Sequence, residues 1–390
     1  MTASSQLTII GGGQLGLYLC QAAQPLGIRT QVVSADSTAP AMGIADSTIV
    51  SDYDVPGLAQ QIAEHADVVT FEFEDVSDVL LDELEALEQA GEFIIRPSID
   101  TLRLIKNKAS QKTWLAEQNF PTQPFVIEES PVENFAELVR QFGLPLVQKA
   151  QTGGYDGYGV QVLAAGSEAK DMWPVPSLIE QYLERPVELG VVVARSVAGE
   201  IVSYPPVRMA FDHDRNILDA VVQPTGLSAS IDKQATELAR QVVERLEGVG
   251  IFAVELFLDE GREKNDQLLV NEIAPRVHNS GHITLDSDKV SQFEQHVRAV
   301  CALPLTEPDT SPPAAVMRNL LYSDRMAQLV EHAKGPLKVS QDGVSLYWYG
   351  KQEGRDGRKM GHTNILTDSV EQSAEAAEKI LNIAVEQVSK

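Results

Sequence analysis

The feature that most constrains the fold is a regular alternation of short apolar runs and amphipathic stretches in the first hundred residues. The apolar runs have the length of strands, and the stretches between them carry apolar residues at helical spacing. The runs are residues 7–10, 29–34, 48–51, 67–73 and 93–98. Strands separated by helices in this way predict an α/β fold with a parallel, doubly wound, Rossmann-like sheet.

A glycine-rich turn follows the first of these runs. Gly11, Gly13 and Gly16 fit the G-x-G-x-x-G pattern, and Asp36 follows at about the distance of a ribose-binding carboxylate. Taken by itself, this pattern is typical of a nicotinamide-dependent dehydrogenase. A second glycine loop and a pair of acidic residues lie further along the chain, and a dehydrogenase leaves both unexplained.

Beyond residue 121 the pattern changes to short strands in pairs, which predict antiparallel hairpins and an α+β layout. The pairs are 144–150 with 159–165, 188–196 with 200–207, and 251–258 with 267–274. Proline-containing stretches separate this region from its neighbours. We therefore expect a Rossmann-like domain over 1–105, a central domain over 106–305, and a small β-rich C-terminal domain over 312–390 that ends in a helix.

The second glycine loop lies between two predicted strands, at residues 151–160. Four glycines in seven residues allow the tip of a hairpin to place its backbone N–H groups against phosphates. Lys149 lies on the entering strand, where its ammonium group can reach the same phosphates. An ordinary flexible hairpin is the alternative interpretation, and Lys149 favours phosphate binding.

Two acidic residues face each other across a later predicted hairpin. Glu255 and Glu272 lie at equal distances from the turn between their strands, so we expect them opposite each other on one face. Two such carboxylates repel each other unless a cation lies between them. With the amide of Asn271 beside them, they predict a site for Mg²⁺ that bridges nucleotide phosphates.

The loop after Glu272 brings Arg276, His278, Asn279 and His282 close together in sequence. Arg276 is suited to stabilise charge on a phosphoryl group during transfer. We interpret the two histidines as hydrogen-bonded loop residues, because the neighbouring acids already suit a harder cation than zinc.

A basic cluster lies near the C-terminal end of a strongly acidic chain. Lys351, Arg355, Arg358 and Lys359 fall within nine residues, whereas the whole chain has 31 basic and 56 acidic residues and a net charge of -25. A phosphorylated substrate is the favoured ligand of the cluster, and a solvated surface loop is the alternative. The net charge argues against nucleic-acid binding.

The cysteine content and the hydropathy indicate the compartment. Cys20 and Cys301 are distant from each other and both lie in apolar stretches, so a disulfide framework or zinc spacing is not indicated. No apolar window approaches the roughly 18 residues of a membrane-spanning helix, and we expect no membrane partner. These features predict a cytoplasmic protein.

Taken together, these motifs resemble the 5-(carboxyamino)imidazole ribonucleotide synthetase family of the ATP-grasp superfamily. The resemblance rests on the strings GGGQLG, VVTFEFEDV, RPS, GGYDGYG, VNEIAPRVHNSGH, SQFEQH, AVMRNLL and GRKMGH, in this order along nearly the whole chain. It implies a central ATP-grasp domain and carboxylation of 5-aminoimidazole ribonucleotide through carboxyphosphate. ATP and Mg²⁺ are the implied cofactors, bicarbonate is the second substrate, and a homodimer is the implied assembly.

The resemblance also assigns residues. Implied contacts with ATP are Lys108, Lys149, Gly153, Gly154, Tyr155, Asp156, Gly157, Tyr158, Gly159, Glu180, Gln181, Tyr182, Leu183, Glu188, His213, Asn271 and Glu272. Implied contacts with the ribonucleotide and carboxyphosphate are Gln14, Leu15, Glu74, Tyr155, Asp156, Arg276, Asn279, Lys351, Arg358 and Lys359. Arg276, Lys149 and Asp156 are the implied catalytic residues, Glu255 and Glu272 the metal ligands, and residues 153–159 a lid. Asp36 loses its ribose role.

Some positions depart from the family pattern. Leu17 and Tyr158 occupy positions where the family has a basic residue, and an arginine expected ahead of the second glycine loop is missing. An active enzyme is the favoured interpretation. A catalytically weakened ATP-grasp protein is one alternative, and another is the related formate-dependent glycinamide ribonucleotide transformylase.

Overall fold

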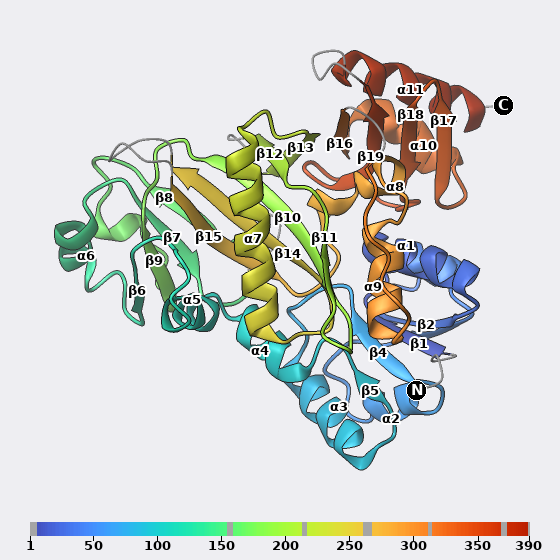
Figure 1. Ribbon diagram of the computed structural model, residues 1–390, viewed down its shortest axis with the longest axis horizontal. Coiled ribbons are helices and arrows are strands. Elements are labelled where there is room, and N and C mark those ends of the chain that lie inside the picture. Colours follow the sequence, from blue (N-terminus) through green and yellow to red (C-terminus); the bar gives the residue numbers. More distant parts are fainter. Residues whose placement is uncertain are drawn as a thin grey trace.

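The computed structural model describes residues 6–153, 159–212, 217–259, 267–310, 314–367 and 373–388. Along the chain it forms an N-terminal unit, a central unit and a C-terminal unit, shown in blue, green to orange, and red in Figure 1. This arrangement confirms the mixed α/β and α+β class predicted from the sequence.

The N-terminal unit is a five-stranded parallel sheet in the order β3-β2-β1-β4-β5. Its strands are β1 (Gln6–Ile10), β2 (Arg29–Ser34), β3 (Ser47–Val50), β4 (Val68–Phe71) and β5 (Ile94–Ile95). Helix α1 (Gln14–Ala23) packs with the side chains of Leu7 and Ile9. Ile10 belongs to the second core, with α2 (Leu58–Ala63) and α3 (Asp78–Ala90). Burial on both faces of β1, β2 and β4 explains why these strands read as apolar runs.

Two helices connect the N-terminal unit to the central one. The sequence predicts one helical stretch over 98–119, but the structure has α4 (Ile99–Lys106) and α5 (Lys108–Glu117). Asn107 separates them because its extended backbone ends α4, while its side chain accepts a hydrogen bond from the N–H of Ser110 at 2.9 Å. Lys108 is therefore the first residue of α5.

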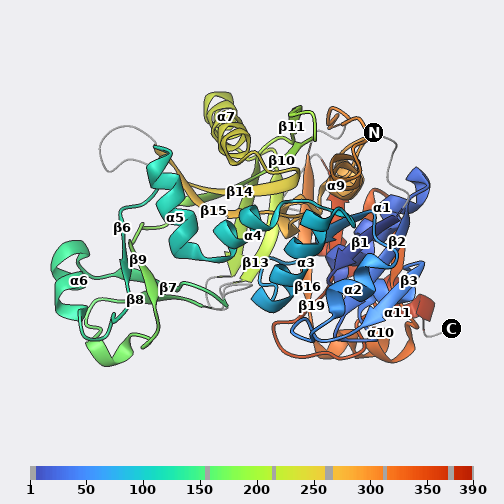
Figure 2. The ribbon, with the colours of Figure 1, turned by 90° about the horizontal axis from the view of Figure 1, so that it is seen from below.

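The central unit contains a small four-stranded sheet in the order β6-β9-β7-β8, at the end of the molecule away from the N-terminal sheet (Figure 2). Its strands are β6 (Phe125–Glu128), β7 (Leu146–Ala150), β8 (Val160–Leu163) and β9 (Ser177–Gln181), with α6 (Phe135–Phe142) beside them. The predicted hairpin of β7 and β8 is confirmed, and Lys149 lies on β7. Residues 154–158 of the loop between these strands lie outside the described residues.

A ten-stranded sheet joins the central and C-terminal units. Its order is β15-β14-β10-β12-β13-β16-β19-β18-β17, with β11 paired to β10. The central strands are β10 (Val187–Arg195), β11 (Ile201–Ser203), β12 (Val207–Asp212), β13 (Ile217–Gln223), β14 (Gly250–Asp259) and β15 (Gln267–Ala274). The C-terminal strands are β16 (Ala315–Leu321), β17 (Leu337–Gln341), β18 (Val344–Trp348) and β19 (Lys359–Leu366). Strands β13 and β16 pair directly, so the two units share one sheet.

Helices cover the large sheet on its central and C-terminal parts. Helix α7 (Ala229–Leu246) packs against β10, and the short α8 (Thr284–Ser287) lies against β19. Helices α10 (Ala327–His332) and α11 (Ser373–Val388) pack together, and α11 covers β17 and β18. The last predicted helix, over 369–388, is confirmed in its described part.

Helix α9 (Gln292–Val300) lies between the N-terminal sheet and the ten-stranded sheet, in contact with α1 and β14. His296 is fully buried on this helix. Its Nδ1 accepts a hydrogen bond from the N–H of Ile251 at 3.0 Å, so the proton is on Nε2, which donates to Thr70 Oγ1 at 2.8 Å. Burial lowers the pKa of His296 to about 3. The side chain therefore joins the two sheets only in its neutral form.

We expect His296→Gln to lower the free energy of unfolding by about 1–3 kcal/mol at pH 8. The reason is that the hydrogen bonds to the N–H of Ile251 and to the hydroxyl of Thr70 would be lost or distorted. Below pH 6.5, His296 of the unfolded wild type binds a proton, whereas the buried His296 of the folded wild type stays neutral. The glutamine of the variant binds no proton in either state. The deficit of the variant should therefore shrink by about 1.4 kcal/mol per pH unit below 6.5. Urea denaturation at pH 8 and 5.5 measures it, and equal deficits at both values would contradict the prediction.

Candidate active site

A cavity of about 1150 Å³ lies where the three units meet. Most residues that the sequence analysis singled out line it: Gln14, Leu15, Glu74, Lys108, Lys149, Glu180, Gln181, Tyr182, Leu183, Glu188, Glu255, Asn271, Glu272, Arg276, Asn279 and Lys359. Gly154, Tyr155, Asp156, Gly157, Tyr158 and His213 lie outside the described residues. Gly153 and Gly159, at the ends of the glycine loop, are described but do not line the cavity. One cavity thus collects residues that are more than 340 positions apart in the chain.

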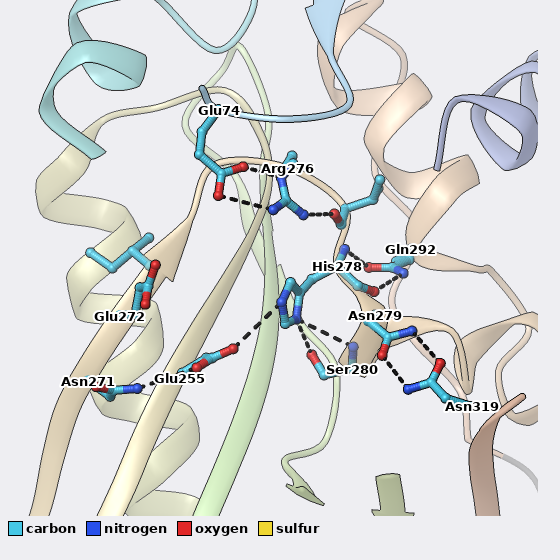
Figure 3. Close-up of polar contacts among 12 residues, drawn as sticks. Glu74, Glu255, Asn271, Glu272, Arg276, His278, Asn279, Ser280, Gln292 and Asn319 are labelled. Carbon is cyan, nitrogen blue, oxygen red and sulfur yellow. Dashed lines mark hydrogen bonds and ion pairs between the residues drawn. The ribbon is translucent and has the colours of Figure 1, made fainter. Parts of the chain in front are cut away.

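The hairpin of β14 and β15 carries the acidic pair. Glu255 is the register partner of Glu272, as the position of the turn predicts. The register then shifts, and Leu256 pairs with Val270, so Asn271 is the extra residue of a β-bulge. A bulge redirects a side chain that strict alternation would send to the other face. The amide Nδ2 of Asn271 consequently lies 3.4 Å from Glu255 Oε2 (Figure 3).

The two carboxylates differ in their protonation. Burial, together with the charge of Glu272, raises the pKa of Glu255 to about 7. Burial would also raise the pKa of Glu272, but Lys108 and Lys149 outweigh it and hold this pKa below its usual value. Lys108 Nζ lies 2.5 Å from Glu272 Oε1. Glu255 therefore ionises against the charge of Glu272, and a divalent cation between the two carboxylates would relieve this repulsion.

Glu180 lines the cavity and is held by two lysines. Its Oε1 lies 2.7 Å from Lys112 Nζ, and its Oε2 lies 2.7 Å from Lys149 Nζ. Although burial opposes ionisation, Lys149 and Lys112 lower the pKa of Glu180 to about 2. Lys149 also donates to Asn271 Oδ1 at 2.9 Å. The carboxylate of Glu180 is thus occupied within the protein, and Lys112 is a residue that the sequence analysis missed.

The first glycine loop encloses a carboxylate from its own sheet. Glu72 follows β4, and its oxygens accept hydrogen bonds from the N–H groups of Gly13 at 2.5 Å and Leu15 at 3.2 Å. These N–H groups at the start of α1 are the ones that a dinucleotide needs for its pyrophosphate. The G-x-G-x-x-G match therefore reflects close packing around Glu72, which burial holds at a raised pKa.

Gly13→Ala tests this packing, because an added Cβ would lie 2.2 Å from Glu72 Oε1. We expect the variant to lose about 1–3 kcal/mol of unfolding free energy, the usual cost of an overpacked site. Gly43→Ala is the matched control, since a Cβ there meets no atom within 4 Å. Urea denaturation of both variants is the measurement, and equal stability of the two would contradict the prediction.

The loop after β15 contributes Arg276, His278 and Asn279 to the lining of the cavity. Arg276 pairs with Glu74 through two nitrogens, with Nε donating to Oε2 and Nη2 donating to Oε1 at 3.1 Å (Figure 3). Arg276 overcomes the effect of burial and lowers the pKa of Glu74. The sequence analysis placed both side chains near the substrate, and the structure adds that they bind each other.

The two histidines of this loop have different environments. His278 lines the cavity, with Nε2 3.6 Å from Glu255 Oε1 and Nδ1 2.9 Å from Ser280 Oγ. His282 is fully buried among aromatic rings, 4.8 Å from His362 between ring centroids. The interpretation of both as hydrogen-bonded loop residues is confirmed, but it did not include the exposure of His278 to the cavity. Its position two residues after Arg276 was the available signal, because alternate residues of an extended chain share a side.

The basic cluster divides between two cavities. Lys359 lines the main cavity, whereas Lys351 and Arg358 line a smaller one of about 220 Å³ together with Asp36. Hydrogen bonding to Thr38 lowers the pKa of Asp36, and Arg358 adds to the effect. Asp36 was left without a role by the sequence analysis, yet it lies beside the residues implied to hold a phosphate. Arg355 is exposed and lines neither of these two cavities.

Leu17 was a departure from the family pattern, and the structure shows where it lies. Its side chain is 1% exposed within the core that α1 shares with α9. It does not line either cavity. The missing basic residue at this position therefore leaves the described walls of the site unchanged.

Comparison with known proteins identifies the family. The ribonucleotide synthetase preATP-grasp domain matches residues 4–106, the ATP-grasp domain 113–293, and the phosphoribosylaminoimidazole carboxylase C-terminal domain 315–376. N5-carboxyaminoimidazole ribonucleotide synthase from Synechococcus elongatus is 36% identical over 92% of this chain and 88% of its own length. The chain belongs to the N5-carboxyaminoimidazole ribonucleotide synthase family. The same enzyme from Bacillus subtilis is also 36% identical, over 92% of this chain and 90% of its own.

Solved structures of the N5-carboxyaminoimidazole ribonucleotide synthase family agree with this assignment. The enzyme from Thermotoga maritima superposes with a TM-score of 0.80 at 34% identity over 96% of this chain and 98% of its own. The Aspergillus clavatus enzyme, in complex with ADP and 5-aminoimidazole ribonucleotide, has a TM-score of 0.82 at 31% identity over all of both chains. The chain is thus an ATP-dependent ligase of the ATP-grasp type, which replaces the dehydrogenase interpretation. Among the described helices, none is long and apolar enough to cross a membrane.

Proposed function

We propose that this enzyme carboxylates the amine of 5-aminoimidazole ribonucleotide in purine biosynthesis, with ATP and bicarbonate as the other substrates. The observation that carries the proposal is the placement of Glu255 and Glu272 opposite each other in a cavity that also holds Lys108, Lys149 and Arg276. The Aspergillus clavatus relative, solved with ADP and this ribonucleotide, supports the choice of substrates.

ATP would lie between the two sheets of the central unit. The segment from Glu180 to Leu183 and the side chain of Glu188 line this end of the cavity and would face adenine and ribose. Because the carboxylate of Glu180 is bound by two lysines, its segment would contact adenine through backbone groups. Lys108 and Lys149 lie next, at the position suited to phosphates.

The residues present suit Mg²⁺. Two carboxylates with hard oxygen donors face each other, and burial together with the charge of Glu272 raises the pKa of Glu255. No cluster of three or more potential metal-binding side chains occurs in the described part of the chain. When bound, the ion would neutralise charge on the transferring phosphoryl group. Asn271 would position Lys149, which donates to its Oδ1 at 2.9 Å.

The ribonucleotide would occupy the other end of the cavity. The backbone of Gln14 and Leu15, the paired Glu74 and Arg276, and the amide of Asn279 surround that space. Lys351 and Arg358 in the small cavity would hold its phosphate, and Lys359 of the main cavity would add a further positive charge.

The reaction would take two steps. A bicarbonate oxygen attacks the γ-phosphorus of ATP, the bond to ADP breaks, and carboxyphosphate forms. The exocyclic amine then attacks the carboxyl carbon, phosphate leaves and the amine loses one proton. Lys149 and Arg276 would position the reactants and stabilise charge, and the predicted lid over residues 153–159, with Asp156, would exclude water. We also propose a homodimer in the cytoplasm, consistent with the two buried free cysteines.

The test is ADP release from ATP and Mg²⁺ with bicarbonate, with and without 5-aminoimidazole ribonucleotide. We expect strong stimulation by the ribonucleotide and formation of the carboxylated product. An equal rate of ADP release with and without the ribonucleotide would overturn the proposed substrate and leave the ligase class in place. Stimulation by glycinamide ribonucleotide with formate would favour the transformylase instead.

A further inference from the structure

Asn319 belongs to the C-terminal unit, yet it binds a side chain of the substrate end of the cavity. It lies on β16 and is 7% exposed. Its Nδ2 donates to Asn279 Oδ1 at 2.7 Å, and its Oδ1 accepts from Asn279 Nδ2 at 3.0 Å (Figure 3). Two amides paired in both directions fix each other in rotation as well as in distance.

A third contact determines which way this pair of amides faces. Asn319 Nδ2 also donates to the backbone oxygen of Leu218 on β13, at 2.7 Å. Since a carbonyl oxygen only accepts, the NH₂ group of Asn319 must face Leu218 and its oxygen must face Asn279 Nδ2. The orientation of the Asn279 amide follows, and one N–H and one lone pair of that amide remain for the cavity.

The backbone of the same loop is held independently. Gln292 on α9 accepts from the N–H of His278 at 3.0 Å and donates to its carbonyl oxygen at 2.6 Å. Asn319 contributes no hydrogen bond to this backbone among those described. Removal of the Asn319 amide should therefore free the side chain of Asn279 to rotate and leave the loop in place.

We propose that Asn319 is a positioning residue that orients Asn279 toward the ribonucleotide. The inference rests on the proposed function, because Asn279 lines the end of the cavity that we assign to this substrate. The C-terminal unit would then serve the reaction through β16, the strand that pairs with β13 of the central unit, as well as through its basic cluster. ATP binds at the opposite end, so its affinity should not depend on Asn319.

Steady-state kinetics of Asn319→Ala and Asn319→Asp test the proposal. Aspartate keeps the shape but cannot donate to Leu218 or to Asn279 Oδ1. For both variants we expect KM for the ribonucleotide to rise about tenfold to a hundredfold, with KM for ATP unchanged. Thr363→Val on the neighbouring strand is the control, because its fully buried hydroxyl has no hydrogen-bond partner in the described structure.

A double-mutant cycle separates positioning from a general structural role. If Asn319 acts through Asn279, Asn319→Ala should change KM for the ribonucleotide little in an Asn279→Ala background. An undiminished effect in that background, an equal rise in KM for ATP, or a loss of thermal stability alone would overturn the inference. Absence of ribonucleotide stimulation in the wild type would overturn the proposed function, and this inference with it, before any substitution is compared.

Discussion

Glu272→Gln is expected to reduce ribonucleotide-dependent ADP formation by at least about 100-fold, while the protein remains folded. The substitution keeps the shape of the side chain and removes the charge that faces both Lys108 and Glu255. Groups that stabilise charge in the transition state typically contribute 10²–10³ in rate. Measurement of kcat and KM for ATP across a range of Mg²⁺ concentrations would record the loss.

The thermal stability of Glu272→Gln should change little, although its activity falls. Glu255 and Glu272 repel each other across the hairpin, and the substitution removes this repulsion together with the pairing to Lys108. We therefore expect a melting temperature close to that of the wild type.

Glu294→Gln is the matched control for Glu272→Gln. Like Glu272, Glu294 has a side chain that is about one-third exposed and pairs with a basic residue, here Arg298. Unlike Glu272, it lies on α9 and lines neither cavity. It should leave turnover unchanged. Full activity in Glu272→Gln, or equal loss in both variants, would contradict the assigned role.

The sequence predicted the parts of the site that depend on local geometry. Counting from the turn predicted that Glu255 and Glu272 lie opposite each other, and the bulge at Asn271 is what brings Glu272 into that register. Counting cannot reveal a bulge, because the bulge depends on packing against another part of the chain. The position of Asn271, beside Glu255 and within reach of Lys149, therefore became known only from the structure.

Contacts between distant segments account for most of what the sequence missed. Glu72 accepts a hydrogen bond from the glycine loop although it lies 59 residues further along the chain. The sequence around Gly13 gives no sign of this contact. Lys112 lies on a helix face where a lysine ordinarily contacts solvent, yet it is 2% exposed. The shared sheet of the central and C-terminal units depends on the pairing of β13 with β16, nearly a hundred residues apart. Local periodicity carries no information about such pairings.

Lys112→Met is expected to have the largest effect on stability, about 3–5 kcal/mol of unfolding free energy. Lys112 and Glu180 are 2% and 1% exposed, and removal of one partner leaves a buried charge poorly compensated. Lys149 alone would then hold Glu180. Burial lowers the pKa of Lys112 to about 8, so desolvation opposes the charged form of this lysine.

The same substitution should also impair turnover, because Lys112 donates to the backbone oxygens of Val270 and Asn271, each at 3.3 Å. These oxygens belong to the bulge that places Asn271 and Glu272 in the cavity, so loss of the ammonium group loosens the acidic pair. Urea denaturation and ATP turnover of Lys112→Met measure the two effects. Lys170→Met removes an exposed ion pair with Glu168 and should change neither. A Lys112→Met protein as stable and as active as the Lys170→Met control would show that the buried lysine supports neither the fold nor the site.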